Sequence, residues 1–164
     1  MQAREGVPSV RMGTGICVMS PDGRLLIVRQ EHEGHVSWGP LGGGLEFGET
    51  IEQCAIREAL EESGLSVRLI RLLSVDQFWY GGEFRGVGFN FLATPGRWPQ
   101  EVVTPEFDGR TRFLDYRWVT KTEAPSFQLP ENDWELWIHC WPADIEETLI
   151  RKLAFDESGQ VLIS

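Results

Sequence analysis

The segment from residue 42 to residue 65, GGGLEFGETIEQCAIREALEESGL, constrains the fold of this chain more than any other. Thr50 and Gln53 have the spacing of a capping box, in which each side chain binds the other residue's backbone at the start of a helix. Gly64 stands where a glycine often ends a helix, because glycine readily adopts the left-handed conformation needed there. The pattern therefore predicts a helix from Thr50 to Ser63, entered shortly after a run of three glycines.

Segments on both sides of this helix have the composition of β-strands. Before the helix, we predict two strands joined as a hairpin through the turn PDG, and then a glycine-rich loop; these are 10–19, 24–30 and 31–44. After the helix, we predict strands at 65–80, 84–93 and 113–119, with a Gly81–Gly82 turn between the first two and a long loop over 96–112. Strands and helices alternate without a shift in composition, so the sequence predicts a single domain over residues 1–164 with a layered α/β or α+β fold.

The last part of the chain has a helical pattern. Tryptophans recur at i, i+3 and i+7, and aliphatic residues follow at steps of four: Trp134, Trp137, Trp141, Ile145, Leu149 and Leu153. Pro142 should interrupt or restart the helix between the two sets. We interpret the tryptophans as a helix face that packs on the sheet, with base stacking as the alternative.

The charge of the chain limits its partners. The 164 residues carry a formal net charge of −10, which argues against binding of nucleic acid polymers or anionic membranes. A small phosphorylated ligand is compatible with this charge, because divalent cations can bridge two negative partners. The three cysteines lack a C-x-x-C spacing and indicate neither a disulfide framework nor a thiolate zinc site. With no apolar run long enough for a secretory signal or a membrane span, we expect a cytoplasmic protein.

Three glutamates share one face of the predicted helix. At 100° per residue, Glu58, Glu61 and Glu62 fall within an arc of about 100°. Two carboxylates ~5 Å apart repel by about 3 kcal/mol at a surface-like dielectric, and Arg57 is the one base in this half of the helix. A hard divalent cation such as Mg²⁺ binds oxygen ligands of this kind. A solvated acidic face is the alternative for the glutamates taken alone.

The glycines before the helix favour the metal-binding alternative. Gly42, Gly43 and Gly44 allow a close approach of the backbone and offer carbonyl oxygens with no side chain in the way. Glycines before a helix also suggest phosphate binding at its N-terminus. The segment has no lysine and does not match G-x-x-x-x-G-K-[ST], so a P-loop is excluded.

The spacing of Gly43, Glu49 and REALEESGL at 57–65 resembles the Nudix box, G-x5-E-x7-R-E-U-x-E-E-x-G-U, in which U is aliphatic. Every specified position is filled, with Ala59 and Leu65 at the two U sites. The resemblance implies an α/β/α sandwich around a mixed β-sheet. It also implies a hydrolase, dependent on Mg²⁺ or in some members Mn²⁺, that cleaves a nucleoside diphosphate linked to another moiety.

Carried over position by position, the resemblance assigns metal binding to three side chains and one carbonyl: Glu58, Glu61, Glu62 and Gly43. Glu58 or Glu61 could instead serve as the base for the attacking water. Arg57 would hold a glutamate through a bidentate contact. Glu49 would be structural, near the start of the helix, where negative charge is favourable.

Outside the box, the sequence departs from the family pattern or leaves a role open. Leu41 precedes Gly42 where many members have proline. Many members supply a further acid from the loop before the last strand, for which the candidates are Glu106, Asp108 and Asp115. The base could come from this loop instead of the helix, so its assignment stays open. Arg29, at the end of the second strand, is the candidate for a phosphate contact. Tyr80 is the candidate for substrate binding, since dinucleoside polyphosphate hydrolases have a tyrosine at a similar distance from the box.

The leading hypothesis is a Mg²⁺-dependent pyrophosphohydrolase that acts on a nucleoside triphosphate, or on a nucleoside diphosphate linked to another moiety, by attack of water on phosphorus. A catalytically silent nucleotide-sensing module is the alternative. A diphosphate isomerase on the same fold is a third reading, which needs a cysteine and an altered box, and Cys54 lies inside the helix. The expected partners are a small nucleotide substrate and, by resemblance, a second copy in a homodimer.

Overall fold

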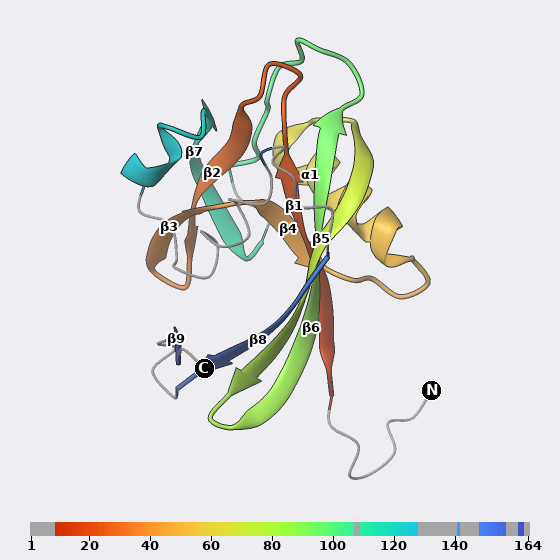
Figure 1. The fold of residues 1–164 in the computed structure, drawn as a ribbon, viewed down its shortest axis with the longest axis vertical. Helices are drawn as coiled ribbons and strands as arrows, with labels where there is room; N and C mark the ends of the chain where they lie inside the picture. The colour runs from red at the N-terminus through yellow and green to blue at the C-terminus, as the bar shows by residue number, and fades with distance from the viewer. Residues whose placement is uncertain (1–8, 107–108, 128–140, 142–147, 157–160, 163–164) are drawn as a thin grey trace.

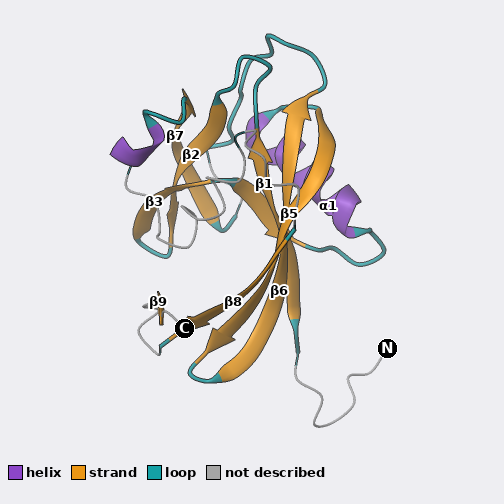
Figure 2. Cartoon of the chain, viewed as in Figure 1, coloured by secondary structure: helices purple, strands orange, loops and turns teal. Residues whose placement is uncertain are grey.

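The computed structural model describes residues 9–106, 109–127, 141, 148–156 and 161–162. Nine strands, one α-helix and one short 3-10 helix lie within these residues (Figures 1 and 2). In chain order they are β1 (Arg11–Val18), β2 (Leu25–His32), β3 (His35–Gly39), β4 (Leu41–Gly44), α1 (Ile51–Ser63), β5 (Val67–Tyr80), β6 (Glu83–Pro95), β7 (Thr111–Val119), η1 (Ala124–Ser126), β8 (Leu149–Phe155) and β9 (Val161–Leu162).

The strands form two sheets. The larger has six strands in the order β4-β1-β6-β5-β8-β9, with β1 parallel to β6 and β5 parallel to β8. The smaller is antiparallel, in the order β3-β2-β7. In Figure 1, α1 and the smaller sheet lie on opposite sides of β1, β5 and β6. The described residues thus have the α/β fold with a mixed sheet that the sequence predicted.

Two hydrophobic cores flank the central strands. Successive residues of β1 enter different cores, because side chains alternate between the two faces of a strand. Ile16 and Val18 pack in the core that contains Ala55 and Ala59 of α1. Cys17 and Met19 pack in a second core, which holds Leu25, Val119 and Trp141. The helix is therefore held on one face of β1, with its other side left for the glutamates.

The helix begins and ends where the capping pattern predicted. The Thr50 hydroxyl accepts a hydrogen bond from the Gln53 backbone at 3.2 Å, and the Gln53 side chain accepts one from the Thr50 backbone at 2.8 Å. Gly64 ends α1 with a φ of 70°. The predicted strands after the helix and the Gly81–Gly82 turn are also confirmed, as β5, β6 and β7.

Two predictions about the chain before the helix are wrong. The strands at 10–19 and 24–30 do not form a hairpin; they share an isolated bridge between Met19 and Leu25 and then join different sheets. The segment 31–44 is not a loop, since it contains the end of β2 and all of β3 and β4. Backbone pairing needs no side chains, so the glycines of β4 form a regular antiparallel ladder with the glycine-rich strand β1.

The prediction of a helical tail is wrong where the structure describes it. Leu149–Phe155 is the strand β8, which pairs with Ser74–Tyr80 of β5. The exposed edge of β5 offers backbone partners that a local helical pattern does not reveal. Trp134, Trp137 and Ile145 lie outside the described residues. Trp141 is buried, and its indole donates a hydrogen bond to the Gly23 carbonyl at 3.0 Å, as the packing interpretation predicts.

No helix among the described residues is long and apolar enough to cross a membrane.

Candidate active site

The acidic face of α1 lies directly against the glycines of β4. The backbone N–H of Gly42 donates a hydrogen bond of 2.7 Å to the carboxylate of Glu62. A side chain at Gly43 would collide with the carboxylate of Glu58. Glu58 and Glu62 are buried, whereas the side chain of Glu61 is 58% exposed. Two of the predicted metal ligands are thus held beside the glycine backbone and the third faces solvent.

Arg57 lies at the centre of this acidic cluster. Its Nε and Nη2 bind the two carboxylate oxygens of Glu49 at 3.1 and 2.7 Å, which is the bidentate geometry predicted for this arginine. Its Nη1 donates to Glu58 at 2.8 Å and to Glu61 at 3.2 Å. Its Nη2 also donates to the Gly44 carbonyl at 3.0 Å. One guanidinium therefore ties β4, the loop before α1 and the helix together.

The charges in this cluster stabilise one another. Hydrogen bonds from Arg57 lower the pKa of Glu49 from 4.5 to about 2, and the same contact raises the pKa of Arg57. Both groups are therefore ionised near neutral pH. Burial raises the pKa of the nearby Cys54 thiol, whose sulfur lies 3.4 Å from both the Thr14 hydroxyl and the Gly44 carbonyl. A neutral, buried thiol packed in this way is a structural residue.

The oxygen donors of the cluster fit a hard divalent cation. Mg²⁺ prefers oxygen ligands such as the carboxylates of Glu58, Glu61 and Glu62. It also binds carbonyl oxygens, which are supplied here by the glycines of β4, the glycine strand. Within the ranges that the structure describes, no three acidic, histidine or cysteine side chains are already gathered as a metal site. Arg57 accounts for this, because its guanidinium contacts both Glu58 and Glu61 and supplies the positive charge between them.

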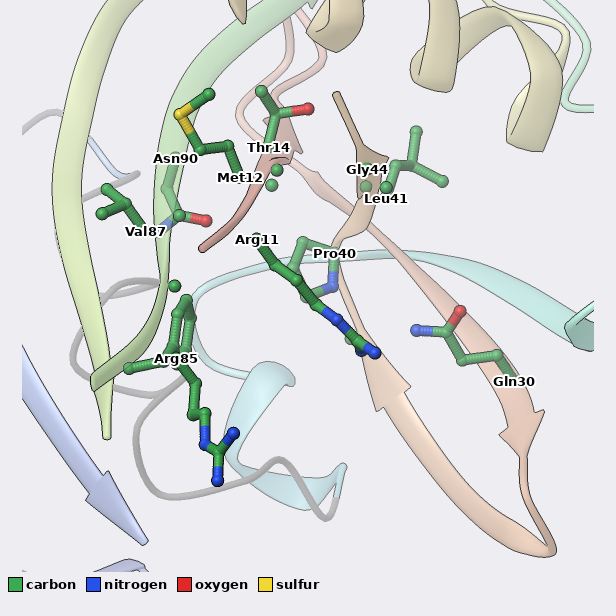
Figure 3. Close-up of a pocket in the computed structure, with 18 of the residues that line it drawn as sticks. Arg11, Met12, Thr14, Gln30, Pro40, Leu41, Gly44, Arg85, Val87 and Asn90 are labelled. Atoms are coloured by element: carbon green, nitrogen blue, oxygen red, sulfur yellow. The ribbon is translucent and has the colours of Figure 1, made fainter. Parts of the chain in front are cut away.

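A cavity of about 1000 Å³ opens beside the glycine strand. Its walls come from β1 to β6, and Gly42, Gly43 and Gly44 form part of its lining (Figure 3). Two arginines, Arg11 and Arg85, also line it. The volume is large enough for a nucleotide-sized ligand. The cavity and the acidic helix share the glycine strand, with the cavity lined by its residues and the glutamates packed against them.

The two residues predicted to contact the substrate, Tyr80 and Arg29, differ in their position relative to the cavity. Tyr80 lines the cavity and stacks on Phe155 with ring centroids 4.7 Å apart. Arg29 is exposed on β2 and is not among the lining residues, where its register neighbour Gln30 is found. Tyr80 is therefore positioned for a ligand in this cavity, and Arg29 is not.

Two of the candidates for a further acid, Asp115 and Glu106, are not among the residues that line the cavity. Asp115 faces Arg29 across β2 and β7 and forms an ion pair of 2.5 Å with Arg117. Glu106 is exposed at the end of the loop after β6. Asp108 lies outside the described residues.

The sequence analysis missed Asn90, a buried polar residue that lines the cavity. It stands between Phe89 and Phe91 in β6 and is 8% exposed. A polar amide inside an apolar strand was the available signal, because buried polar groups require partners.

Comparison with known proteins agrees with this fold and site. The NUDIX domain family matches residues 10–139. An RNA pyrophosphohydrolase from Novosphingobium aromaticivorans is 23% identical over 140 residues, covering 76% of this chain and 86% of that protein. An oxidized purine nucleoside triphosphate hydrolase from Danio rerio is 40% identical over 70 residues, covering 43% of this chain and 45% of that protein. The second match thus spans less than half the length of either protein.

Solved structures share the same architecture. The MutT protein from Bacillus halodurans superposes with a TM-score of 0.68 at 18% identity, covering 94% of this chain and 95% of that one. An Ap4A hydrolase from C. elegans superposes with a TM-score of 0.62 at 18% identity, covering 79% of this chain and 94% of that one. At these identities the structural matches establish the fold alone.

The fold and the acidic helix define a hydrolase of phosphorus-containing acid anhydrides. The chain belongs to the Nudix family. Members of this family generally use divalent metal ions, which agrees with the oxygen donors on α1 and β4.

Proposed function

We propose that this protein is a Mg²⁺-dependent pyrophosphohydrolase that cleaves a diphosphate bond in a nucleoside triphosphate, or in a nucleoside diphosphate linked to another moiety. The observation that carries the proposal is the contact between the acidic face of α1 and the glycine strand that lines the cavity. A diphosphate in the cavity can approach the backbone of Gly42–Gly44 closely, with the glutamates immediately behind it.

The residues of the chain have distinct parts in this reaction. Glu58, Glu61 and Glu62, with the Gly43 carbonyl, would hold the cation, which when bound neutralises phosphoryl charge and lowers the pKa of water. Arg57 keeps the carboxylates of Glu49 and Glu58 in place through its hydrogen bonds.

The base that takes the proton from water is one of two carboxylates. Glu61 is exposed and reaches solvent, whereas Glu58 is buried beside Gly43. Both accept a hydrogen bond from Arg57, and a carboxylate held in place in this way can accept a proton from water.

The charge distribution supports a small nucleotide as the substrate. A net charge of −10 opposes binding of a long polyanion, while Arg11 and Arg85 place positive charge at the cavity. The curated relatives include an RNA pyrophosphohydrolase and an oxidized purine nucleoside triphosphate hydrolase. Both names describe hydrolysis of a phosphoanhydride bond in a nucleotide or at an RNA end. We propose a nucleotide phosphoanhydride as the substrate of this protein. We propose that residues 1–164 form one domain and that two copies of the chain associate as a homodimer.

A nucleotide panel with and without metal tests the proposal. The purified chain is incubated with nucleoside triphosphates, dinucleoside polyphosphates and nucleotide sugars in Mg²⁺, and phosphate-containing products are separated by ion-exchange chromatography. We expect metal-dependent cleavage of at least one class and its loss on addition of a chelator. If no substrate yields a metal-dependent product, the nucleotide-sensing alternative replaces the proposal.

A further inference from the structure

Asn90 belongs to a buried polar network in the larger sheet. Its Nδ2 donates to the Ser74 hydroxyl at 2.9 Å and to the Asp76 carboxylate at 2.8 Å. Asp76 in turn accepts a hydrogen bond of 2.7 Å from Nε of Arg151 and forms an ion pair with it. All four residues are buried, on the adjacent strands β6, β5 and β8.

This network determines which way the Asn90 amide points. An ionised carboxylate can only accept hydrogen bonds, and Arg151 holds Asp76 in an ion pair. The NH₂ group of Asn90 must therefore face Asp76, because its carbonyl oxygen would be repelled there. The Oδ1 atom consequently faces the other way, toward β1.

The oxygen of Asn90 is directed at the cavity and has no partner among the described residues. Oδ1 lies over Gly15, where an added side chain would collide with it. Figure 3 shows Asn90 with its oxygen toward the open space of the cavity. Within the part of the chain that the structure describes, Oδ1 accepts no hydrogen bond, although the residue is 8% exposed. Oδ1 is not among the described side-chain atoms that are fully buried without a partner, so it is open to the cavity. A ligand that covers it must supply a donor, because covering an acceptor without a partner is costly.

Aromatic side chains line the same cavity as this acceptor. The Phe78 ring lies over Gly88, where an added Cβ would be 2.9 Å from the ring. Trp38 and Tyr80 also line the cavity. Aromatic faces bind planar rings, and an acceptor beside them reads the edge of such a ring. The combination is suited to a heteroaromatic base that carries N–H groups on its edge.

We propose that Asn90 is a specificity-determining residue whose Oδ1 accepts a hydrogen bond from an exocyclic amino group of the substrate's nucleobase. Asp76 and Arg151 are positioning residues that hold the amide in the required orientation, and Gly15 provides the space for it. This inference rests on the proposed function, since it assigns the base-binding part of the same substrate.

Matched nucleotides that differ in an amino group test this role. The pairs are AMP with purine riboside monophosphate, GMP with IMP, and CMP with the pyrimidin-2-one riboside monophosphate. Dissociation constants are measured by isothermal titration calorimetry in the presence of a chelator, so that binding of the base is observed without turnover. For at least one pair we expect the wild type to bind the amino-bearing nucleotide about tenfold more tightly, because a buried acceptor is left unpaired by the other.

Two variants and one control complete the experiment. Asn90→Ala removes the acceptor and should abolish the preference. Gly15→Ala keeps Asn90 but displaces its oxygen, and should reduce the preference even if Asn90→Ala fails to fold, since the flexible amide is the group that must move. Ser74→Ala removes one partner of Nδ2, leaves the contact with Asp76 and should retain the preference.

The result separates this inference from the proposed function. A preference that is absent from all three pairs, or that survives in both Asn90→Ala and Gly15→Ala, overturns the role of Asn90 whether or not the protein cleaves nucleotides. A preference that depends on Asn90 supports the role, even if the turnover assay shows no cleavage.

Discussion

Two arginine–carboxylate clusters bind residues that line the cavity, one through Gly44 and the other through Asn90, and they differ in their exposure to water. In the helix cluster, the side chain of Arg57 is 22% exposed and binds Glu49, Glu58 and Glu61. In the sheet cluster, the side chain of Arg151 is 6% exposed and binds Asp76. The first cluster has more negative than positive charge and an open side, whereas the second pairs its charges within the sheet.

This difference indicates different functions for the same chemical groups. A buried pair cannot exchange partners cheaply, because each charge has lost its hydration. It is therefore suited to holding Asn90 in one orientation. A cluster with surplus carboxylates near solvent is suited to binding a cation, which is the role we propose for it.

The largest effect is expected from breaking the buried pair. Arg151→Met leaves the Asp76 carboxylate buried without its ion-pair partner and should lower the free energy of unfolding by about 3–5 kcal/mol. Chemical denaturation measures this change. Arg117→Met, which breaks the exposed pair with Asp115, is the matched control and should cost less than about 1 kcal/mol. If the two variants are equally stable, the distinction between the clusters is wrong.

The next largest effect concerns the helix cluster. Glu61→Gln and Glu62→Gln each remove a proposed metal ligand and should reduce kcat by about 100- to 1000-fold, equivalent to about 3–4 kcal/mol of transition-state stabilisation. Circular dichroism should show an unchanged fold. Glu52→Gln, an exposed glutamate in the first turn of the same helix, should retain wild-type turnover. Near-normal rates in both Glu61→Gln and Glu62→Gln would refute the metal assignment.

The smallest effect concerns the pH dependence of stability. The pKa of Glu49 falls from 4.5 to about 2 in the folded protein, so its ion pair stabilises the fold fully above about pH 4.5 and is lost as the pH falls toward 2. Glu49→Gln should therefore unfold at lower denaturant concentration than the wild type at pH 7. The difference should narrow at pH 3.5. A difference that stays constant over this range would contradict the assignment of the pKa shift to Glu49.

Local sequence patterns predicted the parts of the site that depend on neighbouring residues. The capping box and Gly64 determine the ends of α1, and the spacing of Arg57, Glu58, Glu61 and Glu62 places them on one helix. The family motif predicted a bidentate contact of Arg57 with a glutamate, and in the structure this glutamate is Glu49. These features involve residues within about two turns of each other or in the adjoining loop.

Features that depend on distant partners were not predictable in the same way. The glycine strand 41–44 was expected to be a loop, because its ladder with β1 is made by backbone groups that carry no sequence signal. The segment 149–155 was expected to be helical, because its apolar spacing suits a helix. Its pairing with β5 depends on residues 74–80, and the sequence of the segment itself carries no signal of that partner. The Asn90 network joins three strands, and its members are up to 77 residues apart in the order of the chain, from Ser74 to Arg151.

The sequence alone therefore determined the acidic helix, its caps and the family motif, because helix formation and side-chain spacing on a helix are local. The tertiary structure decided which strands pair, where the cavity opens and which way the amide of Asn90 points. These depend on backbone hydrogen bonds and buried charge pairs between segments far apart in the chain, which form when the sheet assembles.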